Sequence, residues 1–201
     1  DIQRSKIRVI PNWIDTDLFK PIAVEKIPHT ICYVGRLEEQ KNLPALVEAM
    51  HGLEAKLIIY GEGSLQYTLE EQAQTLGVDV QFRGRIANEE LPAALNACTI
   101  FILPSLYEGN PKVLLEAMAC GLAVVGTDVE GITTIIEHEK TGLVCRTSPD
   151  SIRQAIHRLL EDPGLRSRLG EAARESILES SSLAQAVQVE KALYCATALD
   201  S

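Results

Sequence analysis

No stretch of this 201-residue sequence is apolar for long enough to cross a membrane. The apolar runs are short, as in Ile100-Phe101-Ile102-Leu103, whereas a membrane-spanning helix needs about 20 apolar residues. The start also lacks the apolar core and small-residue cleavage site of a signal peptide. We therefore expect no transmembrane segment. Peripheral association of the full-length protein with a membrane is compatible with this sequence. The first residue is Asp1 and not Met, so we interpret the chain as a piece of a longer protein.

Paired cysteines are also missing. The sequence has five cysteines, an odd number, and none forms a C-x-x-C pair. Scattered thiols of this kind suit reduced, buried side chains better than a disulfide framework or a zinc site. The four histidines form no metal-spaced set either. These patterns favour a cytoplasmic protein, and we assign no metal ligands.

The chain has no excess of positive charge. Its 19 Lys and Arg residues stand against 28 Asp and Glu residues, for a formal net charge of −9. This balance argues against nucleic acid or an anionic membrane surface as the main partner. With 46% hydrophobic and 23% charged residues, the composition is that of a globular protein and excludes bulk disorder.

What the sequence does contain is an alternation of short β-rich segments with longer helical patterns. The predicted strands are 31–34, 57–60, 80–83, 100–103, 123–126 and 142–145. Most are apolar at consecutive positions, as expected when helices cover both faces of a sheet. The alternation predicts an α/β fold, a Rossmann-like doubly wound parallel sheet of about six strands with helices on both faces.

Apolar spacing and turn residues predict the helices between and after these strands. They are 43–50, 65–76, 91–97, 110–120, 150–160, 165–178 and 182–194. Ser64 and Asp150 are the predicted caps of two of them, and Gly77 is a predicted stop. We divide the chain into an irregular lead-in over residues 1–28, an α/β domain over 29–180, and a tail helix over 181–201.

A doubly wound sheet binds its ligands at the carboxyl ends of the strands, where the strand order reverses. For the common order 3-2-1-4-5-6, that point lies between the first and fourth strands. Arg36 and Lys41 follow the first strand and could hold a pyrophosphate over one crevice, since arginine offers a planar donor fork and lysine a mobile point charge. The alternative is that both are solvated loop residues.

The loop after the fourth strand leads into a helix. Asn110 is a preferred N-cap and Pro111 suits the first helical position. The free amides of Lys112 and Val113, together with the helix dipole, would then form an anion site. The alternative is an ordinary capped helix.

Glu116 lies among apolar neighbours in the same helix. A buried carboxylate without partners is destabilising, so we expect Glu116 to accept hydrogen bonds, with ligand hydroxyls as candidate donors. Alternatively, it occupies a narrow solvent-facing stripe. The Gly61-Glu62-Gly63 turn is only a weak nucleotide signal, because Gln66 stands at the third glycine position of a G-x-G-x-x-G fingerprint.

Several short motifs follow one another in order. They are Gly35-Arg36-Leu37, Lys41-Asn42, Gly61-Glu62-Gly63, Phe82-Arg83-Gly84, Pro104-Ser105, Glu108-Gly109 and Leu115-Glu116-Ala117-Met118-Ala119-Cys120-Gly121. This set resembles the carboxyl-terminal domain of family 4 retaining glycosyltransferases. The lead-in Val9-Ile10-Pro11-Asn12 resembles the interdomain linker of that family. The most specific element is the pair Glu108 and Glu116, separated by seven residues.

The resemblance implies one half of a GT-B enzyme, the Rossmann-like domain that holds a nucleoside diphosphate sugar such as a UDP- or GDP-sugar. By position, Arg36 and Lys41 would bind the phosphates and stabilise the departing nucleoside diphosphate. Glu108 would contact the transferred sugar, and Glu116 would accept from ribose hydroxyls. We therefore predict catalytic roles for Arg36, Lys41 and Glu108.

The remaining predicted substrate-binding residues contribute mainly backbone groups. They are Gly35, Arg85 and Ile86, the last two at the base edge, and Asn110, Pro111, Lys112 and Val113 near the sugar or distal phosphate. Two segments depart from the family pattern. Asn110-Pro111 replaces a frequent Phe-Gly, which removes an amide donor, and Glu130-Gly131-Ile132-Thr133-Thr134 replaces a frequent Gly-Gly-x-Pro-Glu.

The leading hypothesis is therefore the donor-binding domain of a retaining hexosyltransferase. No metal or other cofactor is expected, because the family neutralises the diphosphate with Arg and Lys. The domain alone is expected to be inactive, since the acceptor site lies on the missing amino-terminal domain. One alternative is a noncatalytic nucleotide-binding or interaction module. The intact set of charged residues argues against this alternative. Another is a nucleotide-sugar epimerase, which would need paired catalytic acids on both sides of the sugar.

Overall fold

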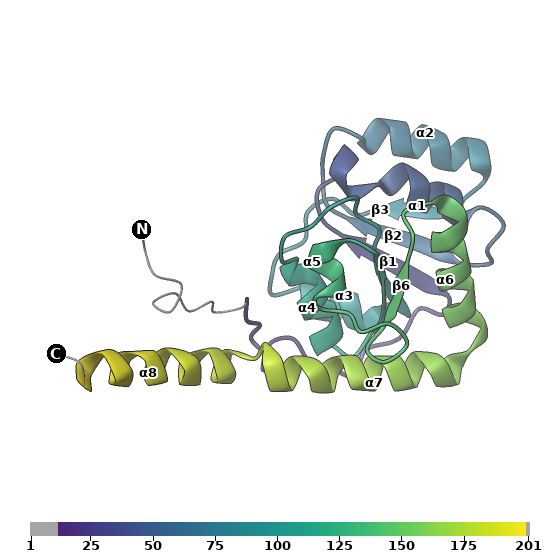
Figure 1. Ribbon diagram of the computed structural model, residues 1–201. Coiled ribbons are helices and arrows are strands. Elements are labelled where there is room, and N and C mark those ends of the chain that lie inside the picture. Colours follow the sequence, from purple (N-terminus) through teal and green to yellow (C-terminus); the bar gives the residue numbers. More distant parts are fainter. Residues whose placement is uncertain (1–11, 200–201) are drawn as a thin grey trace.

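A computed structural model describes residues 12–199 of the chain. Six parallel strands form one sheet in the order β3-β2-β1-β4-β5-β6, and helices lie on both sides of it (Figure 1). The strands are β1 (Thr30–Val34), β2 (Lys56–Tyr60), β3 (Val80–Phe82), β4 (Ile100–Leu103), β5 (Ala123–Thr127) and β6 (Leu143–Cys145). The predicted fold class is confirmed, and the strand order is the common one that the sequence analysis assumed.

The helices follow the strands in the expected alternation. They are α1 (Leu43–Met50), α2 (Gln66–Leu76), α3 (Leu91–Ala97), α4 (Lys112–Ala119), α5 (Glu130–Thr133), α6 (Pro149–Glu161), α7 (Pro163–Ser180) and α8 (Leu183–Leu199), with a short 3₁₀ helix at Glu39–Lys41. Helix α1 packs against α2 and α6, and α4 packs against α7. Every residue of β4 and β5 is buried, as expected for strands covered on both faces.

The predicted helix starts need three corrections. The Ser64 side chain does not cap α2, because its hydroxyl donates to Glu38 (2.9 Å) in the loop after β1. Asp150 lies inside the first turn of α6, which starts at Pro149 and follows Ser148. The predicted start of α4 is one residue too early. Pro111, not Asn110, is the N-cap residue, the first helical residue is Lys112, and no side chain caps that helix. Gly77 does end α2, in the left-handed conformation with φ 66°.

The lead-in segment is packed against the α/β domain over its described residues. Ile14 and Phe19 are each only 3% exposed. The backbone of Ile14 pairs with the joint between α7 and α8, since its N–H donates to the Ser181 carbonyl (2.8 Å) and its carbonyl accepts from Leu183 N–H (3.0 Å). The Val9-Ile10-Pro11 part of the linker-like motif lies outside the described residues.

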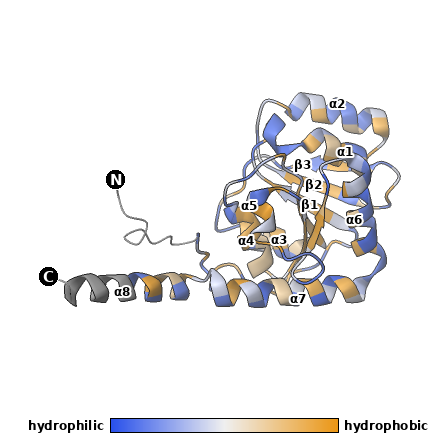
Figure 2. Ribbon diagram, viewed as in Figure 1, coloured by the Kyte–Doolittle hydropathy of each residue, from blue (hydrophilic) through white to orange (hydrophobic). Residues whose placement is uncertain are grey.

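Helix α8 extends away from the body beyond this joint, where α7 ends (Figure 1). The tail helix begins at Leu183 and reaches Leu199, so it is longer than the predicted 182–194. Figure 2 shows apolar residues along its first turns. Val187 and Val189 of this helix are 37% and 41% exposed. Among the described helices, none is both long and apolar enough to span a lipid bilayer.

Candidate functional site

The loops after β1 and β4 meet at the carboxyl edge of the sheet, as the strand order predicts. Besides the Lys41–Glu108 contact, three hydrogen bonds join them: Leu106 N–H donates to the Gln40 carbonyl (2.9 Å), the Gln40 side-chain amide to the Tyr107 carbonyl (3.0 Å), and the Asn42 side-chain amide to the Pro104 carbonyl (3.1 Å). The two loops are therefore held as one unit at the point where the strand order reverses.

Lys41 and Glu108 form an ion pair across this junction. Lys41 Nζ lies 2.5 Å from Glu108 Oε1, and the two side chains are only 14% and 8% exposed. The Ser105 hydroxyl donates to the same Oε1 atom (2.7 Å). Glu108 Oε2 accepts no hydrogen bond from the described residues and is not completely buried. Two predicted catalytic residues, 67 positions apart in the sequence, are thus in direct contact.

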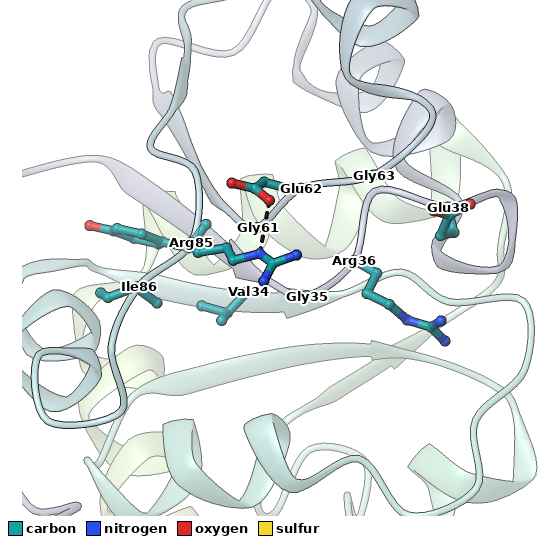
Figure 3. A pocket seen from close by; sticks show the side chains of 10 residues that line it. Val34, Gly35, Arg36, Glu38, Gly61, Glu62, Gly63, Arg85 and Ile86 are labelled. Atoms are coloured by element: carbon teal, nitrogen blue, oxygen red, sulfur yellow. Dashed lines mark hydrogen bonds and ion pairs between the residues drawn. The ribbon is translucent and has the colours of Figure 1, made fainter.

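A cleft of about 630 Å³ shares the loop after β1 with this junction, but Lys41, Glu108 and Glu116 are not among the residues that line it. It is lined by the turns after β1, β2 and β3 (Figure 3), with the residues Val34, Gly35, Arg36, Glu38, Tyr60, Gly61, Glu62, Gly63, Arg85 and Ile86. Four of the predicted site residues are in this set: Gly35, Arg36, Arg85 and Ile86. Three of the ten lining residues are glycines, which present only main chain to the cleft.

Close backbone packing forms the floor of this cleft. A Cβ atom on Gly61 would lie 1.8 Å from the Gly35 carbonyl oxygen, and the φ of Gly61 is +139°. Only glycine tolerates both conditions. The Gly61 N–H in turn donates to the Gly84 carbonyl (2.7 Å). The weak Gly61-Glu62-Gly63 signal therefore reflects close packing of three turns around the cleft.

Arg36 is exposed, and its guanidinium forms no ion pair with a described residue. Its backbone carbonyl accepts a hydrogen bond from the Tyr33 hydroxyl (2.9 Å), which anchors the start of the loop. Burial and the nearby Glu108 carboxylate raise the pKa of Tyr33, so this hydroxyl keeps its proton and stays a donor. In Figure 3 the Arg36 side chain points away from Arg85, so these two cations do not converge.

Arg85 and Glu62 form a second ion pair at the cleft. Arg85 Nε donates to Glu62 Oε2 (2.8 Å), as the dashed line in Figure 3 marks. Both side chains are open to solvent, 84% and 52% exposed. Neighbouring Glu38 accepts from both the hydroxyl and the backbone N–H of Ser64 (2.9 and 3.3 Å), which ties the turn after β1 to the turn after β2.

The start of α4 contacts the lead-in segment. The Asn12 side-chain amide donates to the Asn110 carbonyl (3.0 Å), and Lys112 Nζ lies 5.3 Å from the centre of the Trp13 ring. Asn110 also lines a separate cavity of about 440 Å³ with Asn12 and the end of α7. Lys112 and Val113 do stand in the first turn of α4, where their amides lack helical acceptors. The residues 110–113 are not among those lining the larger cleft.

Glu116 is half-buried on α4. Burial raises its pKa, and the positive charge of Lys112 one turn earlier partly opposes that effect. Among the described residues, no donor hydrogen-bonds to its carboxylate and no cation pairs with it. A desolvated carboxylate with open acceptor positions is poised to accept ligand hydroxyls.

Sequence reasoning missed how the β4 loop is supported. Ser105 and Thr127 are fully buried, and the Thr127 hydroxyl donates to the Ser105 carbonyl (2.5 Å). The segment at 130–134, which departs from the family pattern, forms α5 over Glu130–Thr133, and a Cβ on Gly131 would lie 2.3 Å from the Glu108 carbonyl oxygen. A buried hydroxyl and a glycine are weak sequence signals, because many serve packing alone.

Asp15 holds a turn in the lead-in. Asp15 Oδ1 accepts from the backbone N–H groups of Asp17 (3.0 Å) and Leu18 (3.2 Å).

Within the part of the chain that the structure describes, no three His, Cys, Asp or Glu side chains are placed to share a metal ion. The side chains of four of the five cysteines are described, and all four are buried free thiols.

Residues 15–176 match the family model of the glycosyl transferases group 1. The chain belongs to this family. A relative, an uncharacterised glycosyltransferase of Methanocaldococcus jannaschii, is 35% identical over 167 residues, which is 80% of this chain and 43% of that protein. The match supports the resemblance inferred from the ordered motifs.

Solved structures show the same architecture. The chain superposes on sucrose-phosphate synthase from Thermosynechococcus elongatus with a TM-score of 0.88 and 28% identity, over 96% of this chain and 53% of that one. It superposes on Anabaena Alr3699/HepE in complex with UDP with a TM-score of 0.86 and 21% identity, over 96% and 58%. The fold is thus one half of a GT-B enzyme, and the chain spans about half the length of the proteins it matches.

Proposed function

We propose that this domain binds the nucleoside diphosphate sugar donor of a retaining hexosyltransferase. The observation that carries the proposal is the joined pair of loops at the strand reversal, where Lys41 and Glu108 touch, together with a cleft of about 630 Å³ that Arg36 of the same loop after β1 lines. The UDP complex of Anabaena HepE, a protein of the same fold, supports a nucleotide as the ligand class.

The cleft suggests how the donor would lie. The base would meet the backbone near Arg85 and Ile86, which line the end formed by the turn after β3. The diphosphate would lie toward Arg36 and Lys41 on the turn after β1. Glu116 would accept from the ribose hydroxyls, since its carboxylate has open acceptor positions. The amides at the start of α4 would approach the sugar or the distal phosphate.

The cations then act on the bond that breaks. As the bond between the anomeric carbon and the diphosphate oxygen lengthens, negative charge grows on the leaving diphosphate, and fixed positive groups stabilise it most. Lysine has three N–H donors, so Lys41 can bind a phosphate oxygen and still donate to Glu108. Arg36, which has no described carboxylate partner, is free to approach the diphosphate. The proposal therefore needs no metal ion.

Calorimetric titration of the purified domain with UDP, GDP and ADP tests the binding step. We expect one nucleotide to bind with a dissociation constant on the order of micromolar to millimolar, because half of the enzyme's cleft is absent. Arg36→Ala and Lys41→Ala should each weaken binding by roughly tenfold or more, since each removes a charge-assisted hydrogen bond.

Lys140→Ala is the matched control, because Lys140 is an exposed cation that pairs with Glu137 in the segment before β6. Binding of none of the three nucleotides, or equal losses in all three variants, would contradict the proposal. Retention is tested separately with the full-length protein: NMR of the product should show the anomeric configuration of the donor.

A further inference from the structure

Two buried hydroxyl groups lead from the sheet to the acidic side chain of the candidate site. Thr127 is the last residue of β5, and its hydroxyl donates to the Ser105 carbonyl (2.5 Å). The Ser105 hydroxyl donates to Glu108 Oε1 (2.7 Å). Both side chains have no exposed surface, although buried polar residues are few in this domain.

This chain of contacts treats the two carboxylate oxygens of Glu108 differently. Oε1 receives both Lys41 Nζ and the Ser105 hydroxyl. Oε2 receives no donor from the described residues. A carboxylate held by one oxygen has a fixed orientation, and its second oxygen can accept a hydroxyl from outside.

The loop that carries Glu108 is also fixed in position. Thr127 holds the Ser105 end of the loop from the sheet, and the backbone of α5 packs closely against Glu108 and Gly109 at Gly131. A carbonyl in a buried place needs a donor, because an unsatisfied one is destabilising. The Thr127 hydroxyl meets that need for Ser105.

We infer that Ser105 and Thr127 are positioning residues, which fix the Glu108 carboxylate so that Oε2 faces the transferred sugar. The ligand's identity rests on the proposed function, but the positioning itself does not. Ser105 acts directly on Oε1, and Thr127 acts one step further away by holding the backbone of Ser105.

Crystal structures of Ser105→Ala without ligand test the positioning alone. The Glu108 carboxylate should occupy more than one orientation, because one of the two donors to Oε1 is gone. A single orientation with Lys41 still in contact would overturn the inference, whether or not the domain binds a nucleotide.

Binding measurements test what the positioning does. For the nucleotide found to bind, Ser105→Ala should weaken binding of its glucose conjugate by roughly threefold to tenfold, with binding of the free nucleotide unchanged. Equal losses for both ligands would overturn the inference. If the unaltered domain binds no nucleotide, the proposed function fails and the crystal structures decide the positioning.

Thr127 offers an isosteric comparison with a matched control. Thr127→Val removes the hydroxyl, and Thr127→Ser retains it, so only the valine variant should show the sugar-specific loss. Thr30→Val is the control, because Thr30 is also fully buried and donates to a backbone carbonyl, that of Ile27 (2.7 Å), at the amino end of β1. A sugar-specific loss in Thr30→Val, or none in Thr127→Val, would count against the inference.

Discussion

Two ion pairs stand at the carboxyl edge of the same sheet, and they are held in opposite ways. Lys41 and Glu108 are 14% and 8% exposed, and the buried Ser105 hydroxyl also donates to Glu108. Arg85 and Glu62 have a similar donor to acceptor distance, 2.8 Å, but are 84% and 52% exposed. Distance alone would rank these pairs together, whereas burial separates them.

The difference has a consequence for both stability and binding. A charge that is buried away from water is stabilised by its partner, so removal of one member of a buried ion pair is strongly destabilising. An exposed pair is solvated on its own and can open for a ligand at little cost. We therefore expect the Lys41 pair to fix the geometry of the site, and the Arg85 pair to yield to whatever enters the cleft.

Breaking the buried pair should have the largest effect. Lys41→Met leaves the Glu108 carboxylate without its cation and should lower the free energy of unfolding by about 3 kcal/mol. Urea unfolding at pH 7 measures this change. The double variant Lys41→Met with Glu108→Gln removes both charges and should recover most of the loss. A loss below about 1 kcal/mol in the single variant would mean that the pair behaves as an exposed one.

An unpaired carboxylate extends the comparison. Burial raises the pKa of Glu116, and no described cation pairs with it. Since the folded-state pKa lies above the unfolded value, the group favours folding at acidic pH and this contribution is lost as pH rises through the folded pKa. Glu116→Gln should therefore stabilise the domain at pH 7, by up to about 1 kcal/mol.

Urea unfolding of both proteins across pH 4 to 7, a window chosen around the ordinary range of carboxyl pKa values, checks the sign. The two stabilities should converge toward the acidic end, where Glu116 itself is protonated. The same variant should bind nucleotide more weakly, if the carboxylate accepts from ribose. A variant less stable than the parent at pH 7 would show that Glu116 has a stabilising partner after all.

The sequence could predict where these groups meet but not how they interact. Alternating apolar runs specify the parallel sheet, and the sheet brings the loops after β1 and β4 together, so Lys41 and Glu108 were placed at one edge correctly. That they pair with each other depends on side-chain packing across 67 positions, which local patterns do not encode. The sequence shows Ser105 only as part of the Pro104-Ser105 motif and does not predict its role, because that role depends on burial.

Local rules also erred where tertiary contacts compete with them. Ser64 is a good N-cap residue by type, yet its hydroxyl donates to Glu38 across the cleft floor. Asn110 has the right side chain for a cap, but its carbonyl is engaged by Asn12 and the helix starts after Pro111. In both cases the loop before the helix forms hydrogen bonds with a distant segment of the chain.

A cation–π contact holds a third cation, and its removal should change the free energy of unfolding less than breaking the Lys41–Glu108 pair does. Lys112 Nζ lies over the Trp13 ring at 5.3 Å, and the ring is 39% exposed. Trp13→Ala should lower the free energy of unfolding by roughly 0.5–1 kcal/mol through the lost cation–π contact, with Trp13→Phe intermediate. Urea unfolding monitored by circular dichroism avoids reliance on the fluorescence of the single tryptophan. If Lys112→Met with Trp13→Ala is no different from the sum of the single variants, the contact contributes nothing.

Breaking the exposed pair should have the smallest effect and thereby sharpens the original contrast. Arg85→Ala should change the free energy of unfolding by less than about 0.5 kcal/mol, because both charges stay solvated after the partner is lost. Added salt should leave even that difference smaller, since it screens exposed charges. Urea unfolding at low and high salt, run beside Lys41→Met, measures both points. A loss for Arg85→Ala as large as that for Lys41→Met would mean that burial does not distinguish the two pairs.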